Sequence, residues 1–260
     1  IHLCHRASKR VGQNFLPDPN VLSMMVGAIA PNLDDTLVEI GPGQGALTFP
    51  LLERLGKMTA IELDRDLVEP LRTQALLVGE LTIHNVGAIK FAFCNLVDAG
   101  TSLRVVGNLP YNISTPLIFR LLEQADCIGD MHFLLQKEVV DRLVASPGGK
   151  DYGRLSVMVQ YHCKTEKLFH VGPGAFRPAP KVDSAFCRLV PLTEPEVAAK
   201  DYPCFSSLVQ QCFSQRRKTL RRILKGQLDE TGFNEAGIDS NLRPEQLSVT
   251  DFVHLSNQFT

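Results

Sequence analysis

The residues best suited to carry chemistry are the consecutive segment Asn108-Leu109-Pro110-Tyr111, which directly follows a short apolar run. The amide oxygen of Asn108 and the main-chain carbonyl of Leu109 can each accept one proton of an aromatic amine. Pro110 fixes the bend that aims these acceptors, and Tyr111 offers a flat face for a nucleobase. Such acceptors draw the amine nitrogen toward tetrahedral geometry, so that it can attack a methyl donor without a strong base. The pattern predicts methylation of the exocyclic amine of adenine, although these residue types can also form a plain strand-to-helix turn.

A second pattern is the glycine-rich segment EIGPGQG at residues 39–45, which lies between an apolar run and an expected helix. Gly41 and Gly43 allow a tight turn and a close approach of the backbone to a ligand. Glu62 follows about 20 residues later, where an acid can accept hydrogen bonds from both ribose hydroxyls. A glycine-rich turn alone can be purely structural, but the turn and the acid together favour an adenosine-type cofactor.

The glycine spacing also indicates which adenosine cofactor fits. A dinucleotide site needs the third glycine of G-x-G-x-x-G, and a phosphate-binding loop needs a glycine and a Ser or Thr around Lys150; the chain lacks both patterns. S-adenosylmethionine has no phosphate group, so we expect it to be the cofactor. Cysteine and histidine do not occur at metal-ligand spacing, so we expect no metal.

The elements that must hold these residues follow from the apolar patterning. Short apolar runs alternate with helical stretches from Leu37 onward, which is typical of a parallel sheet covered by helices. The expected strands are 37–39, 58–61, 81–84, 103–106, 131–136, 165–171 and 184–190. The predicted fold class is therefore α/β, with the seven-stranded Rossmann-like sheet of class I S-adenosylmethionine-dependent methyltransferases. A helix capped by Asp18, with Pro19 in its first turn, should precede the sheet.

Length and composition restrict the class of protein. A chain of 260 residues, 44% of them hydrophobic, can form one full α/β domain and a smaller second domain. No apolar run can span a bilayer, and the first residues lack the apolar stretch of a secretory signal. We therefore expect a cytoplasmic monomer with no membrane partner. The seven cysteines lack paired spacing and are expected to be reduced and mostly buried.

The domain boundary is expected just after the last strand. Residues 1–190 should form the catalytic domain, with 1–13 as a basic flexible arm. Residues 191–195 are a Pro-containing linker, and 191–260, which have helical periodicity, should form a small all-helical domain.

The strongest charge cluster lies in this second domain. Its six basic residues are Arg216, Arg217, Lys218, Arg221, Arg222 and Lys225. As one helix, this segment would have a basic face opposite an apolar one. No acidic residue interrupts it, so the charges should be available to RNA phosphates, and 191–260 is predicted to be an RNA-docking domain. The alternative is an ordinary solvated helix surface. Arg6, Lys9 and Arg10 of the arm can extend the same basic track.

Four motifs in order give the chain a family resemblance. They are QNFL at 13–16, EIGPGQG at 39–45, NLPYNIS at 108–114 and PAPKVDS at 178–184. These motifs, with LQKEV at 135–139 and YGRLS at 152–156 between them, resemble the KsgA/RsmA family of ribosomal RNA adenine dimethyltransferases. The resemblance extends from residue 6 to about residue 255.

The resemblance implies a substrate and roles for particular residues. The implied reaction is S-adenosylmethionine-dependent N6 dimethylation of two adjacent adenosines in a hairpin loop near the 3′ end of 16S ribosomal RNA. The implied partner is the small ribosomal subunit or its precursor. Asn14 and Leu16 would close over the cofactor, and Asn108 would contact it and orient the target amine. Phe176 would sandwich the target base against Tyr111, although its residue type also fits a core position. The other implied cofactor-binding residues are Gly41, Gly43, Glu62, Gly87 and Ala88.

One position departs from the family pattern. Where the family usually has Asp followed by Ala, this chain has Gly87-Ala88, and glycine offers no side-chain acceptor to the cofactor's adenine amine. Ala92 stands where a second acid is frequent. A lost hydrogen bond to a charged group weakens binding by about 1.5 to 3 kcal/mol, or roughly ten- to a hundredfold. Three explanations for the missing acid are open: a slipped local alignment, a water molecule that replaces the carboxylate, or impaired catalysis.

Two other functions also fit the sequence. Gly87 is compatible with a ribosome-assembly binding factor of the same fold that has little catalysis. The sheet motifs alone also fit a large-subunit ribosomal RNA adenine dimethyltransferase, although the basic segment and Asn108 look more like the small-subunit branch.

Overall fold

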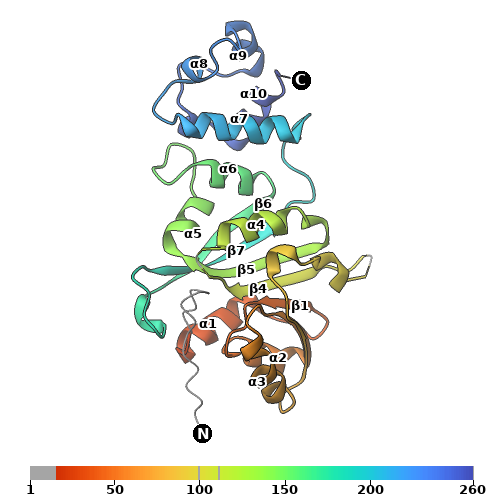
Figure 1. The fold of residues 1–260 in the computed structure, drawn as a ribbon. Coiled ribbons are helices and arrows are strands. Elements are labelled where there is room, and N and C mark those ends of the chain that lie inside the picture. Colours follow the sequence, from red (N-terminus) through yellow and green to blue (C-terminus); the bar gives the residue numbers. More distant parts are fainter. Residues whose placement is uncertain (1–15, 99, 111, 260) are drawn as a thin grey trace. The chain divides into compact units, whose positions relative to one another are not determined.

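The sheet has seven strands in the order β3-β2-β1-β4-β5-β7-β6, with helices around it (Figure 1). A computed structural model describes residues 16–98, 100–110 and 112–259. The strands are β1 (Thr36–Ile40), β2 (Lys57–Ile61), β3 (Glu80–His84), β4 (Leu103–Asn108), β5 (Ile128–Gln136), β6 (Cys163–Val171) and β7 (Ser184–Pro191). β1 pairs in parallel with β2 and β4, β2 with β3 and β4 with β5, whereas β7 is antiparallel to β5. All seven predicted strands and the α/β class are thus confirmed.

The helices alternate with the strands and then continue alone toward the end of the chain. They are α1 (Pro19–Ile29), α2 (Thr48–Leu55), α3 (Arg65–Ala75), α4 (Ser114–Leu122), α5 (Lys137–Leu143), α6 (Arg154–Gln160), α7 (Tyr202–Ser214), α8 (Leu220–Ile223), α9 (Glu230–Ala236) and α10 (Val249–Ser256). α1 begins as predicted, because the Asp18 carboxylate accepts hydrogen bonds from the amides of Asn20 and Val21. In the described part of the chain, no helix has the length and apolar character needed to cross a membrane.

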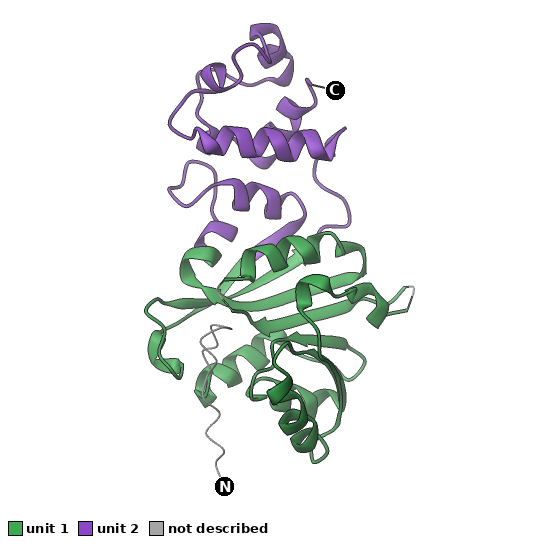
Figure 2. Ribbon diagram, in the orientation of Figure 1, with its two compact units in different colours: residues 1–140, 166–191 green, residues 141–165, 192–260 purple. Residues whose placement is uncertain are grey.

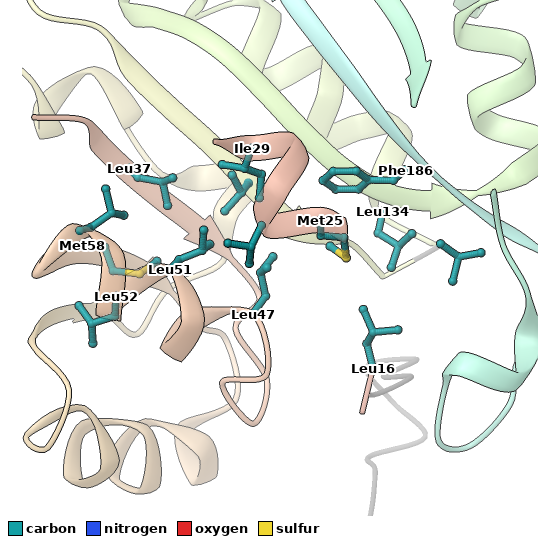
Figure 3. Close-up of a cluster of buried hydrophobic side chains, with 14 of the residues drawn as sticks. Leu16, Met25, Ile29, Leu37, Leu47, Leu51, Leu52, Met58, Leu134 and Phe186 are labelled. Atoms are coloured by element: carbon teal, nitrogen blue, oxygen red, sulfur yellow. The ribbon is translucent and has the colours of Figure 1, made fainter. Parts of the chain in front are cut away.

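One face of the sheet is covered by α1 and α2. Met25 and Ile29 of α1, and Leu51 of α2, pack in one cluster of buried side chains (Figure 3). Leu37 of β1 and Phe186 of β7 belong to the same cluster, so it extends across the sheet. Burying apolar side chains of this size contributes about 1.5 to 3 kcal/mol each, which holds α1 and α2 against the strands.

The chain divides into two compact units (Figure 2). Unit 1 contains residues 1–140 and 166–191, and unit 2 contains residues 141–165 and 192–260. The break after Pro191 lies at the expected linker. The structure also groups residues 141–165 with the later helices, so unit 2 is built from two separate stretches of the chain. Sequence periodicity has no signal for this grouping, because it depends on packing between distant segments.

The basic segment of unit 2 differs from the single helix that was predicted. α7 ends at Ser214, and α8 spans only Leu220–Ile223. In one continuous helix the amides of Leu220 and Arg221 would donate to carbonyls four residues earlier, but here they donate to the carbonyls of Leu242 and Ser240, at 2.8 Å each. The predicted helical face is therefore wrong, and the basic residues lie on a turn followed by a short helix.

The prediction that the cysteines are reduced is wrong for one pair. Cys94 and Cys127 form a disulfide, and their Cα atoms lie 5.5 Å apart. They come from short turns of the chain 33 residues apart, which is why no paired spacing shows in the sequence. Cys163, Cys187 and Cys212 are free and buried as expected, and Cys204 is free and partly buried. Cys4 lies outside the described residues.

Arg104 of β4 ties together three segments of unit 1. Its guanidinium pairs with Asp35 at 2.6 Å and with Asp130 of β5 at 2.9 Å. It also donates to the carbonyl of Ile29, at 2.6 Å, where α1 ends. Burial raises the pKa of Asp130, but the hydrogen bond and charge of Arg104 outweigh it and leave this pKa below its ordinary value. Arg104 thereby fixes the end of α1 to the sheet.

Replacement of Arg104 with alanine should lower the free energy of unfolding by about 3 to 5 kcal/mol, because two largely buried carboxylates lose their main partner. Chemical denaturation measures this loss. Arg72→Ala is the matched control, because Arg72 pairs with Glu69 on the surface of α3, and its loss should cost less than about 0.5 kcal/mol. Equal losses in the two variants would contradict the role of Arg104.

Candidate active site

A cavity of about 680 Å³ lies at the carboxyl ends of the strands in unit 1. Four segments line it: residues 39–47 at and beyond the end of β1, 61–63 at and beyond the end of β2, 86–90 after β3 and 108–110 at and beyond the end of β4. Leu16, Pro17, Leu22 and Met25 add an apolar side. The carboxyl ends of parallel strands share one edge of the sheet, so the predicted cofactor turn and the predicted amine acceptors meet here.

The turn after β1 has a backbone that favours glycine. Gly41 and Gly43 adopt φ angles of 69° and 58°, a region that other residues rarely enter. The amide of Gly41 donates to the carbonyl of Ile61 at 2.9 Å, which ties the turn to β2. Both glycines line the cavity as predicted.

Glu62 is held in place by main-chain amides. Its Oε2 accepts from the amide of Gly43 at 3.2 Å, and its Oε1 accepts from the amide of Asp64 at 2.8 Å. Burial raises the pKa of Glu62, and these hydrogen bonds oppose that rise. Each oxygen keeps a second lone pair, so the fixed carboxylate can still accept from two neighbouring hydroxyls.

Asn85 supports this arrangement and was not predicted. Its Nδ2 donates to the carbonyl of Glu62 at 2.7 Å. The sequence has no signal for such a role, because Asn85 acts on the main chain of a residue 23 positions away.

Asn108 and Leu109 line the cavity at the end of β4. Gly107 lets this strand approach β1, because a Cβ there would lie 2.6 Å from the main-chain oxygen of Ile40. The amide of Leu109 donates to the carbonyl of Leu134 in β5 at 3.2 Å, which fixes the bend before Pro110. The predicted acceptors therefore stand on a rigid strand end.

The remaining predicted site residues differ in whether they line the cavity. Leu16 is buried and lines the cavity. Phe176 is 1% exposed and packs in the buried cluster with Leu16, and it does not line the cavity. Stacking on a base would require its ring to turn outward, so that role stays a prediction. Asn14 and Tyr111 lie outside the described residues.

Comparison with known proteins identifies the family. A model of the family described as "Ribosomal RNA adenine dimethylase" matches residues 4–260. The chain belongs to the ribosomal RNA adenine dimethylase family. The methyltransferase class predicted from the sequence is thereby confirmed.

Several family relatives cover nearly the whole chain. The protein named "Ribosomal RNA small subunit methyltransferase A" of Pseudomonas aeruginosa is 55% identical over 254 residues, which are 98% of this chain and 95% of that one. The protein of the same name from Shewanella oneidensis is 53% identical, with 99% and 96% covered. Among solved structures, a dimethyladenosine transferase from Plasmodium falciparum superimposes with a TM-score of 0.81 at 26% identity, covering 93% of this chain and 95% of that one.

The position that departs from the family pattern lies in the cavity wall. Gly87 and Ala88 both line the cavity after β3. Gly87 has an extended backbone, and a Cβ there would meet only the Leu63 Cδ1 atom, at 3.9 Å. The wall therefore has room for a side chain that this dimethylase lacks. Ala92 is exposed and does not line the cavity.

Gly87→Asp should tighten the binding of S-adenosylmethionine, the predicted cofactor, by roughly ten- to a hundredfold. The added carboxylate fits the open wall and can accept from the adenine amine. Titration calorimetry measures the change, and Gly87→Asn controls for side-chain bulk with a neutral acceptor. Equal or weaker affinity in the Asp variant would reject the assignment of this wall to adenine.

Proposed function

We propose that this dimethylase transfers methyl groups from S-adenosylmethionine to N6 of two adjacent adenosines in a hairpin loop near the 3′ end of 16S ribosomal RNA. The RNA would be part of the small ribosomal subunit or its precursor, in the cytoplasm, and the enzyme would act as a monomer. The observation that carries the proposal is that Asn108 and Leu109 line the same cavity as Glu62 and the glycine turn. The names of the relatives support the small-subunit substrate.

The cavity residues fit the proposed cofactor. Glu62 can accept from both ribose hydroxyls, and the backbone around Gly41 and Gly43 leaves space close to the main chain. Leu16, Gly87 and Ala88 would complete the walls. S-adenosylmethionine supplies a methyl group on a positively charged sulfur, which a weak nitrogen nucleophile can attack.

The residues at the end of β4 then position the nucleophile. Asn108 Oδ1 and the Leu109 carbonyl would each accept one hydrogen of the adenine amine, which turns the nitrogen lone pair toward the methyl group. The amine becomes acidic as the new N–C bond forms, so its proton can leave to water. Tyr111 would stack on the base, and Phe176 would do so if its ring turned outward.

The two alternatives receive less support. An assembly factor with little catalysis is still compatible with Gly87, but relatives that are 53% to 55% identical are named methyltransferases. The structure of the large-subunit enzyme ErmE matches in fold, with a TM-score of 0.74 at 24% identity over 95% of this chain and 99% of that one. It is therefore more distant than the small-subunit relatives.

The basic segment of unit 2 supports an RNA partner, with a correction. Acidic residues outside the segment approach two of its six cations: Arg221 pairs with Glu230 at 2.7 Å, and Arg216 lies 3.9 Å from Glu245. The expectation that all six charges are available to phosphates is thus wrong for those two. The exposed residues Arg217, Arg222 and Lys225 have no ion pair with any described residue, and Lys218 bonds the neutral amide of Gln215. These four charges are available to RNA phosphates.

Asn108→Ala should slow methyl transfer by roughly 10²- to 10³-fold, because one fixed acceptor for the amine is lost. Single-turnover transfer of labelled methyl groups to unmethylated small subunits measures the rate. Asn112→Ala, which alters a neighbouring exposed residue outside the cavity lining, is the matched control and should transfer at the normal rate. A variant at Asn108 that transfers as fast as this control would rule out the proposed role.

Reversing the charges of Arg217 and Arg222 to Glu should lower affinity for the small subunit on the order of tenfold and reduce the salt dependence of binding. Cofactor affinity should not change. The control is Arg54→Glu with Lys57→Glu, the same charge change at exposed sites beside the amino end of β2. Filter binding across a salt series separates the outcomes, and equal affinities for the two double variants would exclude the segment from the RNA interface.

A further inference from the structure

Glu39 is a buried carboxyl group in the wall of the cavity. It is 2% exposed and lies in β1, between Ala60 of β2 and Val106 of β4, which are both apolar. Its Oε2 accepts a hydrogen bond from Thr48 Oγ1 at 2.6 Å. Within the described part of the chain, the Glu39 side chain has no other hydrogen bond or ion pair. The residue is therefore a nearly desolvated acid with a single donor, on the surface where the cofactor would bind.

Few charges surround Glu39. The ionisable side chains that line the cavity are Glu39, Glu62 and the exposed Lys90, counted over the described residues. α2 presents the neutral Thr48 to Glu39, and the neutral Asn108 lines the same cavity at the end of β4. Burial raises the pKa of Glu39 to about 7, with the Thr48 hydrogen bond lowering it and the charge of Glu62 raising it. With a pKa near 7, Glu39 is an acid that a change of charge in the cavity can protonate or ionise at neutral pH.

The proposed cofactor and its product differ in charge, and this difference affects whether Glu39 keeps its proton. S-adenosylmethionine has a sulfonium, an ammonium and a carboxylate, so its net charge is one positive unit. Loss of the methyl group leaves a neutral thioether, and the product has no net charge. A ligand with a net positive charge that enters a poorly solvated cavity favours the ionised form of a nearby carboxyl group, and a zwitterion that lacks the sulfonium charge favours it less.

We propose that Glu39 distinguishes the cationic methyl donor from the neutral product: it holds a proton more strongly in the empty and product-bound protein than in the donor complex, and it releases that proton to solvent when the donor binds. The inference rests on the proposed cofactor. It makes Glu39 a specificity-determining residue, because the ionised carboxylate attracts the donor and has little effect on the product. Product therefore leaves more readily than donor, which favours the repeated exchange that four methyl transfers to two adenosines require.

The pH dependence of donor affinity follows from the raised pKa of Glu39. Below pH 7 the empty site is mainly protonated, and donor binding must expel that proton, so donor affinity should fall by up to about tenfold per unit of pH. Above pH 8 the site is already ionised, and affinity should be constant. Product affinity should change much less over the same range.

Titration calorimetry in pairs of buffers that differ in ionisation enthalpy, each pair chosen to buffer at the pH of the measurement, counts the protons directly. Binding of S-adenosylmethionine at pH 7 should release about half a proton, with more at pH 6 and almost none above pH 8. S-adenosylhomocysteine should release little. Sinefungin, an analogue with a protonated amine in place of the sulfonium, should behave like the donor without transferring a methyl group.

Two nearly isosteric variants identify the responsible group. Glu39→Gln should abolish proton release and reduce the preference for donor over product. Thr48→Val removes the donor that stabilises the ionised form, so proton release should continue and extend to higher pH. Donor binding without proton release, or normal release in Glu39→Gln, would overturn the inference but leave the proposed function intact. Failure of S-adenosylmethionine to bind at all would instead overturn the proposed function, and the inference with it.

Discussion

The site depends on the close approach of β4 to β1 where the two strands end. Gly107 makes this approach possible, because a Cβ there would lie 2.6 Å from the Ile40 oxygen and 3.0 Å from Leu109 Cδ2. The next residue along β4 is Asn108, and the residue after Ile40 is the first glycine of the cofactor turn. The contact therefore brings the amine acceptors beside the cofactor turn, and a larger side chain would push them apart.

Local sequence patterns were sufficient to predict most of the sheet. Buried parallel strands appear in sequence as short apolar runs, and all seven were found at nearly their true positions. The cavity was also predictable in outline, because Glu62 and Asn108 follow strands whose carboxyl ends share one edge. These features depend on residue order and spacing, which the sequence contains.

Features that depend on distant partners could not be predicted. Arg104 forms ion pairs with two acidic residues and a hydrogen bond with the end of α1, and these partners come from separate segments. Cys94 and Cys127, which form a disulfide, lie 33 residues apart in the sequence. The basic segment stops being helical because Leu220 and Arg221 find carbonyl partners near residue 241. Glu39 had a usable signal, since it is an acid within an otherwise apolar strand, but the sequence alone did not show that it faces the cavity.

In the proposed function, fixed neutral acceptors at the end of β4 direct methyl transfer to the exocyclic nitrogen of adenine. Mass analysis of nucleosides from unmethylated small subunits, after incubation with the protein and S-adenosylmethionine, tests it most directly. We expect N6,N6-dimethyladenosine at two adjacent positions of the RNA. Unmodified RNA, or methyl groups on a ring nitrogen or on the ribose, would contradict it.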